Sequence, residues 1–448
     1  MTESLENITG ALIDAATAAG ADAADAMALS GRSVTIDVRG GELEQAESSE
    51  GTDIGLRVLI GGRQACVSAS DTGAQTIRTL ADRAVAMARE APDDPFAGLA
   101  DPAQLGSACA VETLELADPA DAPRPAELQA AACEAEAAAL AVEGVTQVQS
   151  ATANWARRRI HMAATNGFSG GYSRTGSDLY CTAIAGSGAA MQRDGDGDSR
   201  VFRADLRDPA EIGRTAGERA AALLGARKPG TGAYPVLFDE RIAASLIGHL
   251  LSAANGAAVS RGSSWLRDRM GERVLPAGLD LVEDPHRPRV AASRAFDAEG
   301  LPTRRRMLVE DGVLKGWILD LATARKLGLQ STANAHRGPS APPSPGAWNV
   351  ALSQGACSRS DLMREMGTGL LVTSMIGATI NPNTGDYSRG ASGFWVEGGE
   401  IAHPVNECTI AGSLPEMLTR MIPANDARPW LSRVVPSLLV EGLTIAGD

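Results

Sequence analysis

Turn-forming residues are spread so densely through the second half of the sequence that a helical domain is ruled out there. Beyond a break at residues 228–232 (Lys-Pro-Gly-Thr-Gly), short apolar runs are separated by Gly, Pro and Asn. This pattern is typical of short strands between close turns, whereas helices need longer periodic stretches. The alternating helix–strand rhythm of a doubly wound sheet is also missing. We therefore expect an antiparallel, β-rich, barrel-like C-terminal domain over residues 229–448.

The first half predicts a mixed α/β region with antiparallel strands, so the whole chain is expected to be α+β. A Pro- and Asp-rich stretch at 92–119 suggests a boundary between subdomains at 1–118 and 119–228. Apolar residues at helical spacing begin at Leu5, and Asp208-Pro209 has the cap-and-proline pattern of a helix start. The other expected helices are residues 76–91 and 125–141. The expected strands are residues 34–38, 55–60, 64–67, 145–151, 158–163 and 178–185.

Within the C-terminal domain, Asp239 is expected to cap a helix running to about Ala254, directly after a buried-type strand at 234–238. Shorter helices are expected near 320–327 and 360–366. The spacing of Ser413 and Glu416 is that of a capping box. A final strand is expected over 434–445.

The charge balance excludes nucleic acid as a main partner. Asp and Glu number 55 against 41 Lys and Arg, which gives a formal charge of −14, whereas phosphate binding needs clustered basic residues. Two short basic runs, 157–159 and 304–306, are interpreted as solvated strand or loop surface. We find neither a signal-like N-terminus nor an apolar run of about 18 residues, so we expect no membrane span. Six scattered cysteines without a CxxC pair favour reduced thiols and a cytoplasmic location.

Two motifs have structural explanations that compete with the chemical ones. Residues 167–171 fit the G-x-S-x-G pattern of a serine nucleophile at Ser169, but Asn166-Gly167 favours a hairpin turn, not a strand–turn–helix. Residues 194–198 (Asp-Gly-Asp-Gly-Asp) resemble the start of a calcium loop but lack its later ligands. We interpret them as a solvated turn.

The five histidines are too far apart for a zinc-peptidase motif, since no two lie within ten residues of each other. His249 has the most suggestive setting, because Ser245 and Ser252 fall beside it on the polar side of the helix that follows Asp239. We interpret it as a hydrogen-bonded histidine at a domain or cleft surface.

Several stretches together resemble the TldD/PmbA family, and specifically its TldE (PmbA) branch. The strongest is residues 383–401, Asn-Thr-Gly-Asp-Tyr-Ser-Arg-Gly-Ala-Ser-Gly-Phe-Trp-Val-Glu-Gly-Gly-Glu-Ile. Order and spacing agree over essentially the whole chain. The further similar stretches are residues 205–209, 212–213, 296–303, 404–405 and 409–414.

The resemblance implies a peptidase built from two related chains. In this family a TldD-type chain carries a helix-borne H-E-x-x-x-H motif that binds zinc, and its glutamate is suited to activating water. In this sequence the matching positions are Ile247, Gly248 and Ser252, with His249 at an intervening position. The resemblance therefore implies no zinc and no catalytic residue in this chain, with zinc in a TldD-like partner of a heterodimer. The implied substrates are unfolded or ribosomally made peptides.

A strand edge would suit substrates of varied sequence, because strand addition uses mainly backbone hydrogen bonds. Our candidate for a peptide cleft or subunit interface is Arg389, Gly390, Ser392 and Phe394, and Trp395 fits core packing equally well. Two alternatives stay open. One is a partner-independent peptide-binding or scaffolding protein. The other is an independent hydrolase that uses Ser169 or Cys408.

Overall fold

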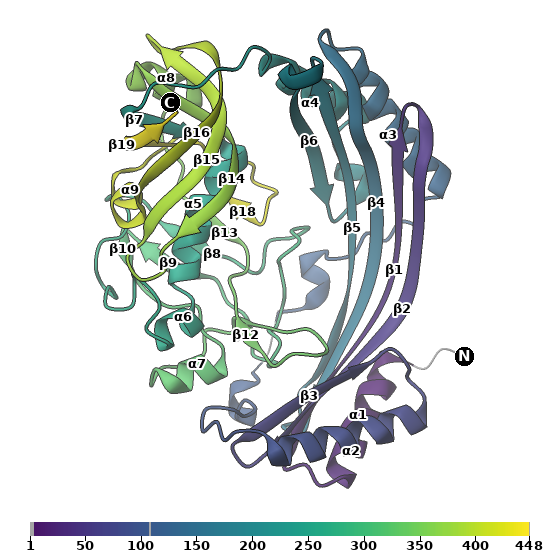
Figure 1. The fold of residues 1–448 in the computed structure, drawn as a ribbon. Coiled ribbons are helices and arrows are strands. Elements are labelled where there is room, and N and C mark those ends of the chain that lie inside the picture. Colours follow the sequence, from purple (N-terminus) through teal and green to yellow (C-terminus); the bar gives the residue numbers. More distant parts are fainter. Residues whose placement is uncertain (1–3, 107–108, 448) are drawn as a thin grey trace.

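The computed structural model describes residues 4–106 and 109–447. Figure 1 shows two parts side by side, a strongly curved sheet with the helices α1 to α4 and a C-terminal part that contains a barrel. Across the described residues, no helix combines the length and apolarity that crossing a bilayer requires. The expected α+β class is confirmed.

The curved sheet has six antiparallel strands in the order β3-β2-β1-β4-β5-β6. Because β1 pairs with β2 on one side and β4 on the other, the sheet continues across the subdomain boundary expected near residue 118. Its strands are β1 (Ala23–Arg39), β2 (Glu42–Ile60), β3 (Arg63–Ala69), β4 (Val145–Ala164), β5 (Ser169–Ala185) and β6 (Gln192–Arg200).

These strands are far longer than the sequence pattern indicates. β1 has 17 residues and β2 has 19, whereas only residues 34–38 and 55–60 were expected to be extended. Residues 42–51 of β2 are all exposed, so they show no alternation of buried and exposed side chains. Backbone pairing with β1 holds this stretch in the sheet without side-chain burial.

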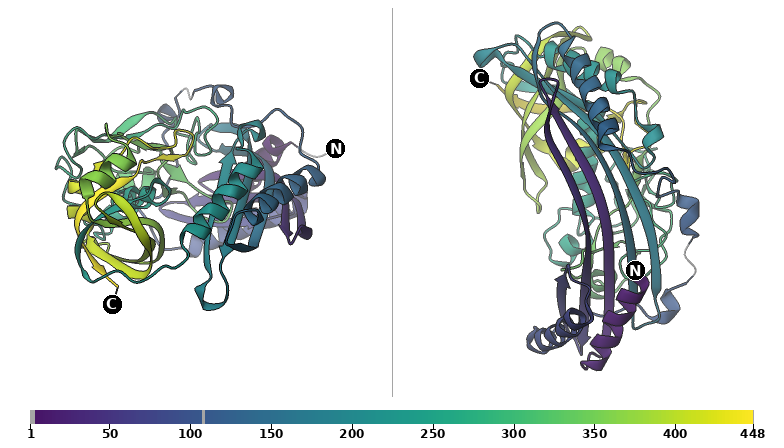
Figure 2. Two further views of the ribbon diagram at one scale, coloured as in Figure 1. Left: turned by 90° about the horizontal axis from the view of Figure 1, so that it is seen from above. Right: turned by 90° about the vertical axis from the view of Figure 1, so that its right-hand side faces the viewer.

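Two helical layers cover opposite ends of the same sheet face (Figures 1 and 2). α1 (Leu5–Ala18) and α2 (Ala74–Glu90) pack on one end of β1 and β2. α3 (Pro125–Leu140) and α4 (Pro209–Ala222) pack on the other end, against β1, β4 and β5. The remaining helices of this half are short 3-10 turns at Pro102–Gln104, Val111–Leu114, Gly188–Ala190 and Arg203–Asp205.

The C-terminal part contains a closed barrel of five strands, which confirms the expected barrel-like domain. Its order is β16-β15-β14-β7-β19, and pairing of β16 with β19 closes the ring. All neighbours are antiparallel except β7 and β14. The barrel strands are β7 (Gly232–Phe238), β14 (Gly369–Ile380), β15 (Asp386–Glu397), β16 (Glu400–Ser413) and β19 (Leu438–Ala446), and β17 (Ile422–Pro423) pairs with β19.

A second, smaller sheet and short helices complete this part. The sheet has the order β10-β9-β8-β13-β18, with strands β8 (Leu281–Glu283), β9 (Arg306–Glu310), β10 (Val313–Leu314), β13 (Val350–Leu352) and β18 (Arg433–Val434). β11 (Ala335–His336) pairs with β12 (Ser344–Pro345). The helices are α5 (Glu240–Ala253), α6 (Gly256–Ser260), α7 (Leu321–Lys326), α8 (Arg359–Met366) and α9 (Leu414–Arg420). The helix expected after Ser413 is present as α9, but the Ser413 side chain makes no capping hydrogen bond.

Candidate functional site

Helix α5 is where the resemblance places the zinc motif, and its two faces differ in character. Asp239 caps it by accepting a hydrogen bond from the Arg241 N–H, as expected. Ala243, Leu246 and Leu250 are buried in the large C-terminal core. The opposite face carries a small polar patch of half-buried and exposed residues, Ser245, Gly248, His249 and Ser252.

The residues at the motif positions do not fit a zinc ion. Ile247 is fully buried in the core, and Gly248 has no side chain. A Cβ built on Gly248 would lie 3.0 Å from Nη1 of Arg433, so a guanidinium occupies the space beside this position. The Ser252 hydroxyl donates to the Gly248 carbonyl at 2.9 Å. In residues 4–106 and 109–447, no three His, Cys, Asp or Glu side chains converge as metal ligands.

His249 is held by aromatic packing, and its ring edge meets Tyr387 of β15 with ring centroids 5.8 Å apart. Its Nε2 is buried and finds no hydrogen-bond partner in the described part of the chain, so the expected hydrogen bond is not made at this nitrogen. Burial lowers the pKa of His249, and the nearby charge of Arg389 lowers it further. The ring is therefore a neutral group at neutral pH.

The four candidate residues on β15 lie in the barrel wall, where this strand pairs with β14 on one side and β16 on the other. The expectation that their strand offers a free edge is therefore wrong. Arg389 Nε donates to the Gly377 carbonyl of β14 at 2.7 Å, and Phe394 packs against a small core beneath α8. Gly390 lies against Ile376 and Ser392 is half-buried. Trp395 is a core residue in edge contact with Tyr234, with ring centroids 4.9 Å apart.

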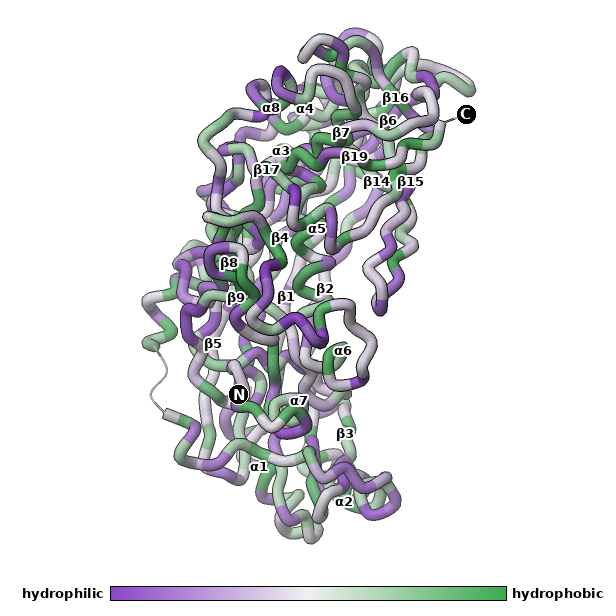
Figure 3. The backbone as a smooth tube through the Cα atoms, turned by 90° about the vertical axis from the view of Figure 1, so that its left-hand side faces the viewer, coloured by the Kyte–Doolittle hydropathy of each residue, from purple (hydrophilic) through white to green (hydrophobic). Residues whose placement is uncertain are grey.

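A free strand edge does exist on the neighbouring strand, β14. β7 pairs only with Leu370, Leu371 and Val372, so residues 374–380 pair with β15 alone within the described chain. Residues 374–392 of β14 and β15 form an outer hairpin that extends past the barrel. The tip of this outer hairpin is hydrophilic (Figure 3). Ile376 on it is 73% exposed. Tyr387, the partner of Ile380 across the hairpin, also contacts His249, which places this edge beside α5.

The two candidate nucleophiles lack the surroundings that activation needs. Cys408 is buried, its thiol donates to the Ala391 carbonyl at 3.2 Å, and burial raises its pKa to about 11. Ser169 opens β5 in a hairpin, as Asn166-Gly167 suggested, and no helix follows it. Its Oγ lies 3.5 Å from Nε2 of His161, whose Nδ1 pairs with the Thr9 hydroxyl and not with a carboxylate.

Residues 194–198 form part of the edge strand β6, so our interpretation as a solvated turn is wrong. Asp196 and Asp198 are buried, and Asp196 pairs with Arg219 and Arg207, each at 2.7 Å. The alternating glycines are required because a Cβ on Gly197 would overlap the Tyr180 ring. Ion pairs within the first half therefore replace the solvent or cation that the acidic run suggested.

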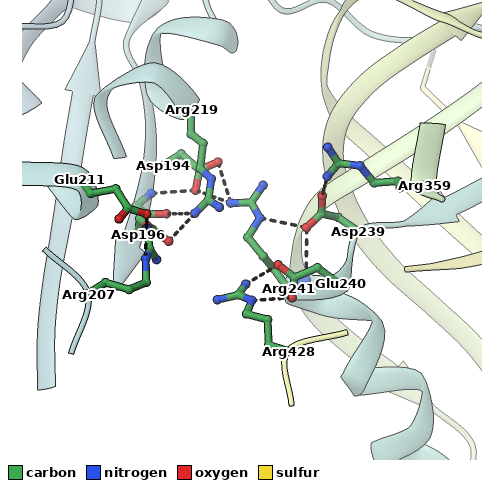
Figure 4. Close-up of polar contacts among 11 residues, drawn as sticks. Asp194, Asp196, Arg207, Glu211, Arg219, Asp239, Glu240, Arg241, Arg359 and Arg428 are labelled. Atoms are coloured by element: carbon green, nitrogen blue, oxygen red, sulfur yellow. Dashed lines mark hydrogen bonds and ion pairs between the residues drawn. The ribbon is translucent and has the colours of Figure 1, made fainter. Parts of the chain in front are cut away.

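Asp194 of this strand connects the two parts of the molecule through Arg241 (Figure 4). Arg241 Nη1 lies 3.2 Å from Asp194, and its Nε lies 3.0 Å from Asp239 on its own helix cap. Burial alone would raise the pKa of Asp239, but Arg241 and Arg359 outweigh burial and hold this pKa below its usual value. Arg428 Nε also holds Glu240 at 2.9 Å. The start of α5 is thus fixed against the curved sheet.

The C-terminal part also contains a stack of three side chains that the sequence analysis did not single out. The Trp348 ring stacks on His336 with centroids 3.8 Å apart, and the Arg294 guanidinium lies 3.7 Å from the Trp348 ring centroid. His336 Nε2 donates to the Gly346 carbonyl at 3.0 Å. Burial, with a further contribution from Arg294, lowers the pKa of His336 to about 4.

This histidine is expected to make folding sensitive to acid. Its folded pKa of about 4 lies below the ordinary value of 6.5, so its contribution to stability is complete above pH 6.5 and is lost as pH falls toward 4. The loss amounts to about 3 kcal/mol. We expect His336→Gln, which keeps a donor for Gly346, to remove this part of the pH dependence. Urea unfolding of both proteins between pH 7 and pH 4 measures the difference, and parallel curves would contradict the assignment.

Three family models match successive stretches of the chain. The PmbA/TldA metallopeptidase domain 1 matches residues 24–88, the central domain matches residues 118–224, and the C-terminal domain matches residues 231–447. Together they cover most of the curved sheet and nearly all of the C-terminal part.

Whole-length relatives agree with these matches. The chain is 34% identical to Metalloprotease PmbA of Escherichia coli O157:H7, over 93% of this chain and 90% of that protein. It is also 34% identical to a PmbA homologue of Haemophilus influenzae, over 97% and 94%. A crystal structure from Bacteroides thetaiotaomicron superposes with a TM-score of 0.90 at 25% identity, covering 99% and 98%. TldE from Thermococcus kodakarensis superposes with a TM-score of 0.85 over 98% and 100%, and at 21% identity this match shows the fold alone.

Proposed function

Because the chain belongs to the PmbA/TldD metallopeptidase family, we propose that it is the TldE-like, non-catalytic subunit of a two-chain zinc peptidase acting on unfolded or ribosomally made peptides. The observation that carries this proposal is the composition of α5. Ile247 is buried, Gly248 faces Arg433, and Ser252 bonds its own helix, so none of the motif positions offers a metal ligand or a general base. Zinc and the activated water then belong to a TldD-like partner in the cytoplasm.

The chain's own contribution would be to hold extended peptide beside that partner. Residues 374–380 of β14 offer backbone groups along a strand edge, and addition of a peptide strand there would depend little on peptide sequence. Exposed Ile376 supplies an apolar contact on the same hairpin. Arg389 keeps the outer hairpin in shape through its hydrogen bond to Gly377.

The decisive experiment measures cleavage of a labelled unfolded peptide by this chain, by its H-E-x-x-x-H relative, and by the two together. We expect turnover only in the mixture, abolished by a zinc chelator and restored by added zinc. Chelator-sensitive turnover by this chain alone would show that a metal site exists in it and would overturn the proposal. Peptide binding by this chain without any gain of activity in the mixture would favour the alternative, a partner-independent peptide-binding or scaffolding protein.

Arg389→Gln is expected to lower the turnover of the pair roughly three- to tenfold. The substitution removes the hydrogen bond from a charged donor that holds Gly377. Such bonds contribute about 1.5–3 kcal/mol, and because this one is exposed we expect about half of that, which corresponds to the stated fold-change. The matched control is Arg420→Gln, which changes an exposed arginine at the end of α9. Peptide turnover and size-exclusion elution of the mixture are the measurements. If both stay unchanged in Arg389→Gln, the outer hairpin has no part in substrate holding or assembly.

A further inference from the structure

A cavity of about 290 Å³ lies between the curved sheet and the C-terminal part, on the sheet face opposite the helices. Side chains alternate along a strand. Ala24, Ala26 and Ala28 of β1 therefore face the helical layer, while Met27 and Leu29 face the cavity. The C-terminal part closes it with residues 291–298 and 336–337. The volume is at the lower end of the range for small-ligand pockets.

Four arginines line this cavity although the chain as a whole is acidic. They are Arg158, Arg174, Arg294 and Arg337. In the basic run at 157–159, Arg158 and Arg159 are exposed, as the expected solvated surface requires, but strand alternation turns Arg158 toward the cavity and its two neighbours toward the other face. Arg174 donates to the carbonyls of Ala291 and Ser293 and is thereby held in place.

The positive charge of this cavity is incompletely balanced. Nε of Arg294 and Nη2 of Arg337 are buried and have no hydrogen-bond partner in the described chain, and the Arg337 side chain is only 2% exposed. Asp25 pairs with Arg337, but it also neutralises Arg57. The Asp297 oxygens are occupied by backbone groups, because they accept from the N–H groups of Glu299, Leu301 and Ala335. Buried donors without partners are costly, which indicates that a ligand supplies the missing acceptors.

Most of the remaining wall is apolar, with Tyr172, His336 and Asp297 as its polar members, and the apolar part selects among anions. Met27, Leu29, Ile160, Met162 and Phe296 surround the guanidinium groups. A free inorganic anion would leave this surface without a partner, whereas a carboxylate attached to an apolar group would contact both kinds of wall. Guanidinium groups also match a carboxylate in bidentate geometry.

The geometry points to a binding site for the C-terminal carboxylate of a peptide whose last residue is apolar. This inference rests on the proposed function in one respect, the choice of a peptide as the source of the carboxylate. It assigns to the non-catalytic chain a separate anchoring point for one end of an extended substrate, on the face of the curved sheet that looks toward the C-terminal part.

The test is calorimetric titration of the full chain with N-acetyl-phenylalanine, its C-terminal amide and inorganic phosphate. We expect the acid to bind at least tenfold more tightly than the amide, and phosphate to compete weakly. Arg158→Gln should weaken binding of the acid about tenfold, which corresponds to one charge-assisted contact. The matched control, Arg159→Gln, changes the next residue of β4 on the opposite face and should leave binding unchanged.

Three results would overturn the inference: equal binding of acid and amide, tighter binding of phosphate than of the acid, or equal effects of the two substitutions. Both variants change side chains that are not buried, and unchanged melting temperatures verify that they fold. The outcome is separable from that of the proposed function. Carboxylate binding can persist when mixing with the zinc chain gives no cleavage, and cleavage can occur when the acid does not bind.

Discussion

Asp25→Asn is expected to lower the free energy of unfolding by about 3–5 kcal/mol, the usual cost of leaving buried charges unpaired. Asp25 Oδ2 lies 2.6 Å from both Nε and Nη2 of Arg57, and Arg337 pairs with its other oxygen. The Arg57 and Arg337 side chains are 4% and 2% exposed. Asparagine would leave two desolvated guanidinium groups without a negative charge between them.

Urea unfolding at pH 7 measures this loss, with Asp53→Asn as the matched control. Asp53 is an exposed aspartate of β2 whose partner is the Ser70 hydroxyl, so its replacement should change stability by less than about 0.5 kcal/mol. Arg337 belongs to the C-terminal part, so Asp25→Asn should also weaken the contact between the two parts. An added protease should then cleave the chain between them faster. A loss below about 1 kcal/mol would mean that water or another group already compensates the arginines.

Gly213→Val is expected to cost about 3 kcal/mol or more by forcing α3 and α4 apart. A Cβ built on Gly213 would lie 1.8 Å from the Ala135 carbonyl oxygen, a backbone atom that can move only with its whole helix. Ile212 and Ala216 on α4 share one core with Ala132 and Ala135 on α3, so separation of the helices opens that core. Overpacking of this kind usually costs about 1–3 kcal/mol, and backbone contact places this case at the upper end.

Gly10→Ala is the control, because Gly10 is also helical but a Cβ added to it would meet no atom within 4 Å. Alanine there should raise stability by about 0.5–1 kcal/mol through helix propensity. Thermal and urea unfolding of both variants measure the contrast. Equal effects at the two glycines would show that α3 and α4 can separate without loss of core packing.

Local signals predicted the helices well because each signal lies within the one or two helical turns that it describes. The α4 start was marked by Asp208 and Pro209, and the α5 start by Asp239; both aspartates cap their helices in the structure. The strands were underestimated because sheet pairing is not local. Residues 42–51 are extended only because β1 lies beside them. Likewise Asp196 of β6 was interpreted as part of a turn because its arginine partners, Arg207 and Arg219, follow later in the chain, on or near α4.

The candidate site was predictable only where one helix carries it. The position of His249 and the unsuitability of its neighbours for zinc binding could be read from a single helix. Arg433, which occupies the space beside Gly248, comes from a strand distant in sequence and had no signal of its own. The cavity arginines are similarly scattered, and only Arg158 belonged to a recognisable basic run. Convergence of distant residues depends on the packing of the two parts, which no periodicity encodes.

The C-terminal part contacts the curved sheet near both ends of its long strands. Arg241 meets Asp194 near the end covered by α3 and α4, and Arg337 meets Asp25 near the end covered by α1 and α2. The strands between these contacts are long, and β4 alone has 20 residues, or about 66 Å. With both ends attached, the space between the parts widens only if the strands change their bend and twist. The sheet is therefore the part of the molecule that must bend when the two parts move apart while both contacts stay in place.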